Sequence, residues 1–334
     1  MMTDLYELTM MNGYLRFGME NNRACFDIFY RKQGDMTAYA VAAGLEQAID
    51  YVRNLHFSNE DIAYLRSLNI FDEAFLARLA TLRFTGEILA VPEGTIIFPG
   101  EPIVRVIAPI MEAQLLETAL LNIINHQTLI ATKAFKICHE AKGVVMEFGL
   151  RRAQGPDAGI YGARAAIIGG CASTSNVLTA KMYGVPCAGT HAHSWVMSFD
   201  TELEAFREYA RIYPNNCLLL VDTYDTLRSG IPNAIKVFDE MKAKGLKPLG
   251  IRLDSGDFPG SLVAKGLIVP EGEGFSYTGD GKLLVNALLR PKSAAEIEKT
   301  VTSLPRTKKC CFKISLGHHG CTCSSQTSTA KCQS

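Results

Sequence analysis

The sequence lacks an excess of charge of either sign. Its 334 residues include 34 Lys and Arg and 34 Asp and Glu, so the formal net charge at pH 7 is zero. Proteins that hold nucleic acid electrostatically carry a basic excess, and acidic solvating tails carry the opposite one. The composition therefore excludes both classes, and we expect no nucleic acid among the partners.

Long hydrophobic runs are also missing. The run 103–110 is interrupted by Arg105 and Pro109, whereas a membrane span needs about 20 apolar residues. Asp4 and Glu7 stand near the start, where a signal peptide would carry Lys or Arg. We expect a cytoplasmic protein without a membrane partner. A hydrophobic content of 48% over this length favours about two globular domains.

The 10 cysteines fall into two groups. One group is scattered among apolar neighbours, which is typical of small buried residues in a reduced protein: Cys25, Cys138, Cys171, Cys187 and Cys217. The others crowd the last 25 residues, where no apolar periodicity is present. Their spacing matches no zinc framework well, so we predict a disordered tail there and keep a metal site as the alternative.

The first part of the chain mixes helical and strand patterns. Apolar residues recur at helical spacing over 40–55, and Ser58 with Asp61 resembles a capping box that opens a second helix. Three short apolar runs within 84–106 are separated by turns rich in Pro and Gly, which predicts a small antiparallel sheet. Residues 111–141 contain no Pro and, up to Gly143, no Gly, which predicts one long linking helix.

From Val144 onward, short apolar strands alternate with helices. The strands are predicted at 144–148, just before Gly189, at 217–221 and at 248–251. An amphipathic helix over 231–244, closed by Gly245, lies between the last two strands. This alternation predicts βα units whose parallel strands form a sheet or barrel.

Each of these predicted strands is followed by charged or polar side chains. In chain order they are Arg151 and Arg152, then Thr190, His191, His193 and Ser194, then Asp222 and Asp225, and then Arg252, Asp254, Ser255 and Asp257. The carboxyl ends of the strands form the active-site face of βα architectures. Guanidinium groups suit a carboxylate or phosphate, and carboxylates beside them favour an intervening Mg²⁺. The set predicts phosphoryl or phosphoribosyl chemistry that requires magnesium.

The same residues also have structural interpretations. Surface salt bridges would account for the two arginines, and capping of the next helix would account for Asp222 and Asp225. His191 and His193 alternate along the chain, so at most one of them enters a given site, and a zinc site lacks a third ligand. No glycine-rich phosphate loop of either common type is present.

Four segments resemble the nicotinate phosphoribosyltransferase family in the same order along the chain. They are TDLYELTM at 3–10, EFGLRRAQG at 147–155, GTHAHS at 189–194 and RLDSGD at 252–257. The resemblance implies an α/β fold. In that fold, an incomplete (β/α) barrel of phosphoribosyltransferase type is preceded by an α+β N-terminal domain with a small antiparallel sheet.

The resemblance also implies a reaction and a set of roles. Family members join nicotinate to 5-phosphoribosyl 1-diphosphate in NAD biosynthesis, giving nicotinate mononucleotide and diphosphate with coupled hydrolysis of ATP. His193 is implied as the residue that ATP phosphorylates. Tyr6 is implied to stack on nicotinate, often from the other subunit of a homodimer, and Thr190 and Arg252 to contact nicotinate.

Together with the strand-end pattern, the resemblance widens the expected site. The substrate-binding set then includes Arg151, Arg152, Asp254 and Ser255, and the expected Mg²⁺ ligands are Asp222, Asp225 and Asp257. ATP enters as a co-substrate.

After residue 257 the resemblance breaks. Four βα units are clear where a closed barrel needs about eight, so we expect the second half of the barrel to be missing and turnover to be weak or absent. The expected organisation is an N-terminal domain 1–110, a linking helix 111–141, a partial barrel 142–258, a remnant segment 259–306 and the cysteine-rich tail 307–334. Two alternatives stay open: a nicotinamide phosphoribosyltransferase, and an inactive form that only pairs with a full-length partner.

Overall fold

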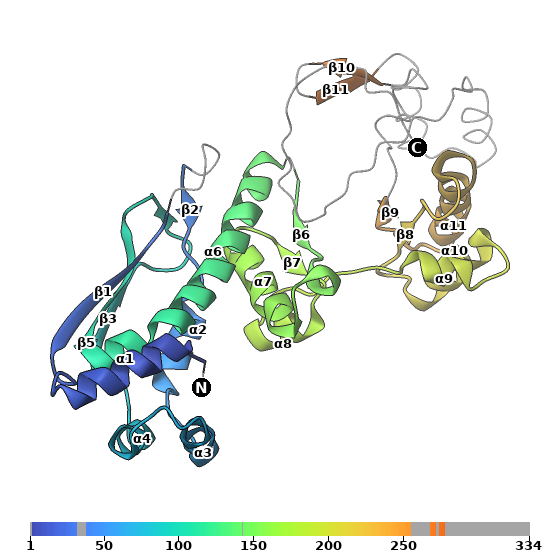
Figure 1. Ribbon diagram of the computed structural model, residues 1–334. Helices are drawn as coiled ribbons and strands as arrows, with labels where there is room; N and C mark the ends of the chain where they lie inside the picture. The colour runs from blue at the N-terminus through green and yellow to red at the C-terminus, as the bar shows by residue number, and fades with distance from the viewer. Residues whose placement is uncertain (1, 32–37, 142, 255–267, 272–273, 278–334) are drawn as a thin grey trace, which may run out of the picture. The chain divides into compact units, whose positions relative to one another are not determined.

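The chain divides into two compact units, residues 1–189 and residues 190–334. The computed structural model describes residues 2–31, 38–141, 143–254, 268–271 and 274–277 (Figure 1). Within the predicted remnant segment, only the antiparallel pair β10 (Ile268–Glu271) and β11 (Gly274–Tyr277) is described. The rest of that segment and the predicted tail 307–334 lie outside the described residues.

The first unit contains the antiparallel sheet expected from the sequence, but with different neighbours. Its strand order is β1 (Arg23–Phe29), β5 (Pro102–Pro109), β3 (Glu87–Ala90). The middle apolar run of the predicted sheet forms β4 (Ile96–Ile97), which pairs with β2 (Ala40–Val41) instead. The prediction that the three runs pair with one another was therefore wrong, because β4 and β1 each find a distant partner.

The predicted helix over 40–55 begins later than expected. Residues 40 and 41 are extended in β2, and α2 spans Leu45–Arg53. Gly44 separates the two because it adopts φ 104°, a left-handed conformation that glycine tolerates at no steric cost. The next helix, α3 (Asn59–Ser67), confirms the capping box: the Ser58 hydroxyl accepts from the Asp61 amide, and the Asp61 carboxylate accepts from the Ser58 amide.

The predicted linking helix 111–141 is two helices, α5 (Ile110–Leu115) and α6 (Glu117–Glu140). At the break, the amide of Thr118 donates to the Glu7 carboxylate at 2.8 Å. Glu7 is fully buried and lies in α1 (Leu5–Arg16), 111 residues away in the chain. A tertiary contact that no local pattern encodes therefore starts α6.

Helices cover the sheet of the first unit. Helix α5 packs on β1 and β5, and α1 packs on α5, while α3 lies beside α4 (Glu73–Ala80) (Figure 1). Phe75, Leu79 and Leu116 are fully buried in the core between these elements. Each such side chain stabilises the fold by about 1.5–3 kcal/mol.

The remainder of the first unit contains short parallel strands. β6 (Met146–Glu147) pairs with β7 (Ser173–Thr174), and Thr174 forms a further parallel bridge to Cys187. Between them lie a 3₁₀ turn, Leu150–Arg152, and helix α7 (Pro156–Ile168), which packs along α6 (Figure 1). Helix α8 (Val177–Tyr183) follows. The β7 strand was not predicted.

In the described part of the second unit, one parallel strand pair is covered by helices. β8 (Leu218–Leu220) pairs with β9 (Gly250–Arg252), as the sequence predicts. The helices are α9 (His193–Met197), α10 (Glu202–Ile212) and α11 (Ile231–Ala243), the last preceded by a π-helical turn, Thr226–Gly230.

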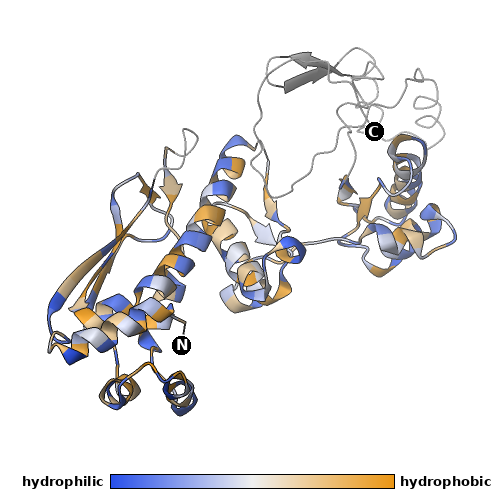
Figure 2. Cartoon of the chain, in the orientation of Figure 1, coloured by the Kyte–Doolittle hydropathy of each residue, from blue (hydrophilic) through white to orange (hydrophobic). Residues whose placement is uncertain are grey.

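Helices α10 and α11 bury one face against this strand pair. Figure 2 shows hydrophobic and hydrophilic residues side by side along these helices, as expected where one face is buried. Phe206 of α10 and Leu219 of β8 are fully buried at the centre of the unit.

The cysteines only partly match expectation. Cys171 and Cys217 are buried, and Cys138 is half-buried, but Cys25 and Cys187 are exposed. The side chain of Cys25 lies on an outer strand, so apolar neighbours in the sequence did not imply burial. In the part of the chain that the structure describes, no helix has both the length and the hydropathy of a membrane span.

Candidate functional site

The polar residues that follow β8 and β9 gather at one edge of the second unit. Because the two strands run parallel, their carboxyl ends lie together, and the segments after Leu220 and Arg252 meet. The start of α9 contributes His193 to the same place. The cluster therefore contains residues from three of the four segments in the strand-end pattern; the segment with Arg151 and Arg152 lies in the first unit.

His193 lies between two carboxylates. Its Nδ1 is 3.2 Å from the Thr223 hydroxyl and 3.9 Å from Oδ1 of Asp222, and its Nε2 is 3.6 Å from Oδ2 of Asp254. The His193 side chain is 33% exposed, so a solute can reach it. The ring is oriented from both sides, and a positive charge on it would be stabilised by both carboxylates.

Asp222 holds the two strand ends together. Its side chain is 2% exposed, and Oδ2 accepts the backbone amide of Asp254 at 2.7 Å. A hydrogen bond to a charged group of this kind contributes about 1.5–3 kcal/mol. Asp222 therefore places Asp254 beside His193.

Thr190 and Arg252, which are both expected to contact nicotinate, lie in direct contact with each other. A guanidinium nitrogen of Arg252 donates to the Thr190 hydroxyl at 2.9 Å, and another pairs with Asp254. The Arg252 side chain is 25% exposed. The Arg252 guanidinium and the half-buried ring of His193 thus contact the same carboxylate, that of Asp254.

Asp225 has a different position from the one expected for a metal ligand. Its Oδ1 accepts the amides of Leu227 at 3.1 Å and Arg228 at 2.9 Å, so it caps the π-helical turn. This is the structural interpretation that the sequence left open. The other two expected ligands differ: Asp222 lies in the cluster, and Asp257, like Ser255, lies outside the described residues.

The carboxylate oxygens at the strand ends are the type of ligand that Mg²⁺ prefers. Asp222 and Asp254 each offer carboxylate oxygens near His193, and Mg²⁺ is usually held by one or two carboxylates together with water and substrate phosphates. Within the described ranges, no group of three or more His, Cys, Asp and Glu forms a complete metal site by itself.

Three expected site residues lie in the first unit. Arg151 and Arg152 form the 3₁₀ turn after β6, and both side chains are exposed. Tyr6 lies on α1 and is 44% exposed. Its neighbour Glu7 is buried and accepts the hydroxyl of Thr118 at 2.7 Å, which anchors the N-terminal motif to α6.

Sequence reasoning missed Thr223. The sequence places Thr223 directly after Asp222 at a strand end, but a hydroxyl in that position indicates a site less strongly than a carboxylate does. The structure confirms that His191 and His193 face different surroundings: His191 is 7% exposed and buried beneath the cluster, whereas His193 faces into it.

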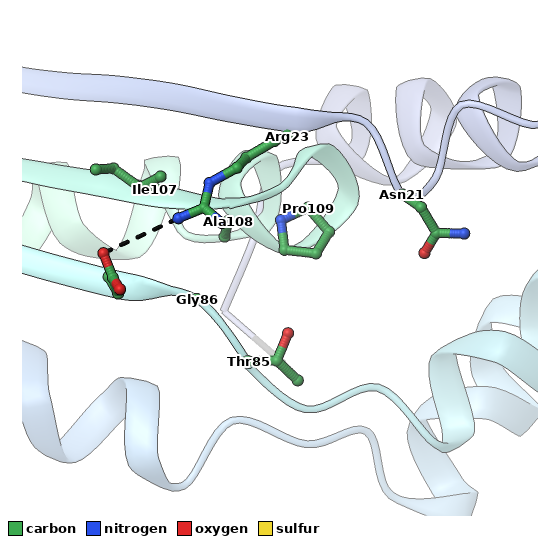
Figure 3. A pocket seen from close by; sticks show the side chains of 8 residues that line it. Asn21, Arg23, Thr85, Gly86, Ile107, Ala108 and Pro109 are labelled. Atoms are coloured by element: carbon green, nitrogen blue, oxygen red, sulfur yellow. Dashed lines mark ion pairs between the residues drawn. The ribbon is translucent and has the colours of Figure 1, made fainter.

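Among the described residues, surface hollows also lie away from this cluster. One, of about 260 Å³, is at the end of the β1–β5–β3 sheet beside Thr85, where Arg23 and Glu87 form an ion pair at 4.0 Å (Figure 3). Another, of about 420 Å³, lies between α10 and α11 beside Arg207 and Glu240. Neither is lined by the residues expected to bind substrate.

Comparison with known proteins places most of the chain in one family. The model of the nicotinate phosphoribosyltransferase (NAPRTase) N-terminal domain matches residues 1–125, and that of the NAPRTase family matches residues 144–280. Nicotinate phosphoribosyltransferase of Bacillus subtilis is 49% identical over 76% of this chain and 52% of its own length. Nicotinate phosphoribosyltransferase 2 of Arabidopsis thaliana is 33% identical over 98% of this chain and 67% of its own length.

A solved structure agrees. The crystal structure of human nicotinic acid phosphoribosyltransferase aligns with a TM-score of 0.72 and 33% identity, covering 79% of this chain and 64% of that chain. The chain spans about half the length of the Bacillus relative and about two thirds of the Arabidopsis one.

Proposed function

The chain belongs to the nicotinate phosphoribosyltransferase family, and on that premise we propose that it carries the family's reaction. In this reaction, nicotinate displaces diphosphate from 5-phosphoribosyl 1-diphosphate, and ATP hydrolysis is coupled to turnover. The observation that carries the proposal is the cluster in which Thr223, Asp222 and Asp254 surround the half-buried ring of His193.

The proposal includes an incomplete (β/α) barrel. Two features support it: the parallel pairs β6–β7 and β8–β9, and the polar residues at their carboxyl ends. The expected domain ranges remain predictions, as does the homodimer in which Tyr6 of one subunit would stack on nicotinate bound to the other.

His193 is proposed as the phosphate acceptor. A ring nitrogen without a proton supplies the electron pair that attacks the γ-phosphorus of ATP, and the bond to the departing ADP breaks. The ring becomes positively charged once the N–P bond forms. Asp222 and Asp254, within 4 Å of the ring nitrogens, stabilise that charge, while Thr223 holds the ring at Nδ1.

Arg252 and Thr190 are proposed to recognise nicotinate. A guanidinium pairs with a carboxylate through two parallel hydrogen bonds, whereas a neutral amide offers no charge to it. The exposed Arg151 and Arg152 suit the phosphate groups of the second substrate in the same way. Selection of the acid over nicotinamide follows from the charge of Arg252.

Mg²⁺ is proposed as the cofactor, held by Asp222 and Asp254. When bound, it would neutralise charge on the phosphates of the substrate. The carboxylates themselves keep His193 oriented and tie the ends of β8 and β9 together, whether or not the ion is present.

Labelling of the full chain tests the proposal. With γ-labelled ATP and Mg²⁺, we expect an acid-labile phosphate on the wild type and on His56→Ala, an exposed histidine of the first unit, but not on His193→Ala. Nicotinate mononucleotide formation is measured in parallel, with nicotinamide as the competing substrate. Equal labelling of His193→Ala and the wild type would show that the proposal is wrong. Faster use of nicotinamide would assign the amide reaction instead.

A further inference from the structure

His191 connects the segment 190–193 to strand β8. Its Nε2 is the acceptor for the backbone amide of Leu220 at 3.2 Å, and its Nδ1 is 3.3 Å from the carbonyl oxygen of Ala192. The ring packs edge-on against Tyr209 with centroids 4.6 Å apart. The segment 189–194 has expected roles at Thr190 and His193 but none at His191.

These contacts determine the protonation of the ring. A backbone amide can only donate, so Nε2 carries no proton, and the Nδ1 proton of the neutral ring points to the Ala192 carbonyl. Burial lowers the pKa of His191 and the nearby Arg252 guanidinium lowers it further, whereas the hydrogen bond to the Ala192 carbonyl raises it; the net lowering favours the same neutral form.

His191 occupies the edge of β8 that β9 leaves open. The Val221 amide donates to the Arg252 carbonyl, and the Cys217 carbonyl accepts from the Leu249 amide. The backbone groups of the odd-numbered residues therefore face β9. The Leu220 amide points to the opposite edge, where the imidazole takes the place of a neighbouring strand. A buried amide without an acceptor is destabilised, because it has lost its hydrogen bond to water without gaining another.

We propose that His191 is a positioning residue for His193. Its neutral ring holds the segment 190–193 on β8, two residues before the ring that is expected to accept phosphate. Because Asp222 and Thr223 directly follow the same strand, this single hydrogen bond keeps His193 in register with both. The inference rests on the proposed function for the role of His193, but the anchoring itself does not.

Two variants of the full chain separate the hydrogen bond from the packing. His191→Gln supplies an amide oxygen at about the reach of Nε2, whereas His191→Phe fills the ring volume without an acceptor. We expect amide exchange at Leu220 to accelerate about tenfold in His191→Phe and to stay within about threefold of the wild type in His191→Gln. The rate of His193 phosphorylation should fall in the Phe variant and recover in the Gln variant. Equal exchange and equal phosphorylation in the two variants would overturn the proposal.

A measurement on the wild type keeps the inference independent of folding and turnover. Nitrogen-15 shifts of the histidine rings, assigned by the signal that His191→Gln removes, should show Nδ1 protonated and Nε2 unprotonated at neutral pH. A protonated Nε2 would overturn the inference even if both variants fold poorly. Correct ring shifts and exchange rates in a chain that is never phosphorylated would instead refute the proposed function and retain the anchoring role.

Discussion

Gly230 is the position where one added methyl group should damage the second unit most. A Cβ at this residue would lie 1.8 Å from the carbonyl oxygen of Val221 and 2.9 Å from its Cβ. Both atoms belong to the strand segment that directly precedes Asp222 and Thr223. Relief of the clash therefore requires the π-helical turn or the strand end to move.

The expected cost of Gly230→Ala follows from that distance. Overpacking of a rigid site costs about 1–3 kcal/mol and occasionally more, and a backbone oxygen at this distance belongs at the upper end. The helical preference of alanine returns at most about 1 kcal/mol. We expect a net loss of about 2–3 kcal/mol in the free energy of unfolding, together with slower phosphorylation of His193.

The single tryptophan makes the assay local. Trp195 lies in the second unit, where its ring packs on Phe199 with centroids 4.8 Å apart and its Nε1 donates to the Ala205 carbonyl at 3.0 Å. Urea unfolding followed by tryptophan fluorescence therefore reports on this unit. With a slope of about 2 kcal/mol per molar urea, the midpoint should fall by about 1–1.5 M.

Gly245→Ala is the matched control. Gly245 has φ 75°, but no atom lies within 4 Å of its added Cβ. Only backbone strain of about 1–2 kcal/mol is expected there. The reasoning is refuted if Gly230→Ala lowers the midpoint no more than Gly245→Ala does.

Three further predictions concern single contacts. Thr223→Val should slow phosphorylation of His193 by about 5- to 10-fold while Thr223→Ser stays near the wild type, because only the hydroxyl contact at Nδ1 is lost; labelling rates decide this. Arg252→Gln should reduce the ratio of kcat/KM for nicotinate to that for nicotinamide by at least about tenfold, and an unchanged ratio would argue against the charge-based selection of the acid. Burial raises the pKa of Glu7, so Glu7 binds its proton more tightly in the folded protein than in the unfolded chain. The contribution of Glu7 to the free energy of unfolding should therefore be largest at acidic pH and should decline as the pH rises from about 4.3 through the raised pKa. Glu7→Gln should remove that slope in urea unfolding, whereas a slope identical to the wild type would contradict the assignment.

The residues with functional chemistry could be predicted from the sequence because strand ends and motifs are local features. The run 217–221 and the motif at 252–257 each indicate where a strand ends and which polar residues follow it. The capping box at Ser58 is equally local, since its two hydrogen bonds join residues three apart. In these places the chain's own pattern contains all the partners of the interaction.

Tertiary structure alone decided which distant groups meet. Glu7 accepts a hydrogen bond from the Thr118 amide at the start of α6, 111 residues away in the chain. Strand β4 pairs with β2, a partner that the pattern of apolar and polar residues within β4 does not specify. Likewise, His191 and His193 look equivalent in the sequence, yet one accepts a buried backbone amide of β8 and the other faces the cluster. Sequence patterns determine what each residue offers, but the packing of segments far apart in the chain determines which partner it finds.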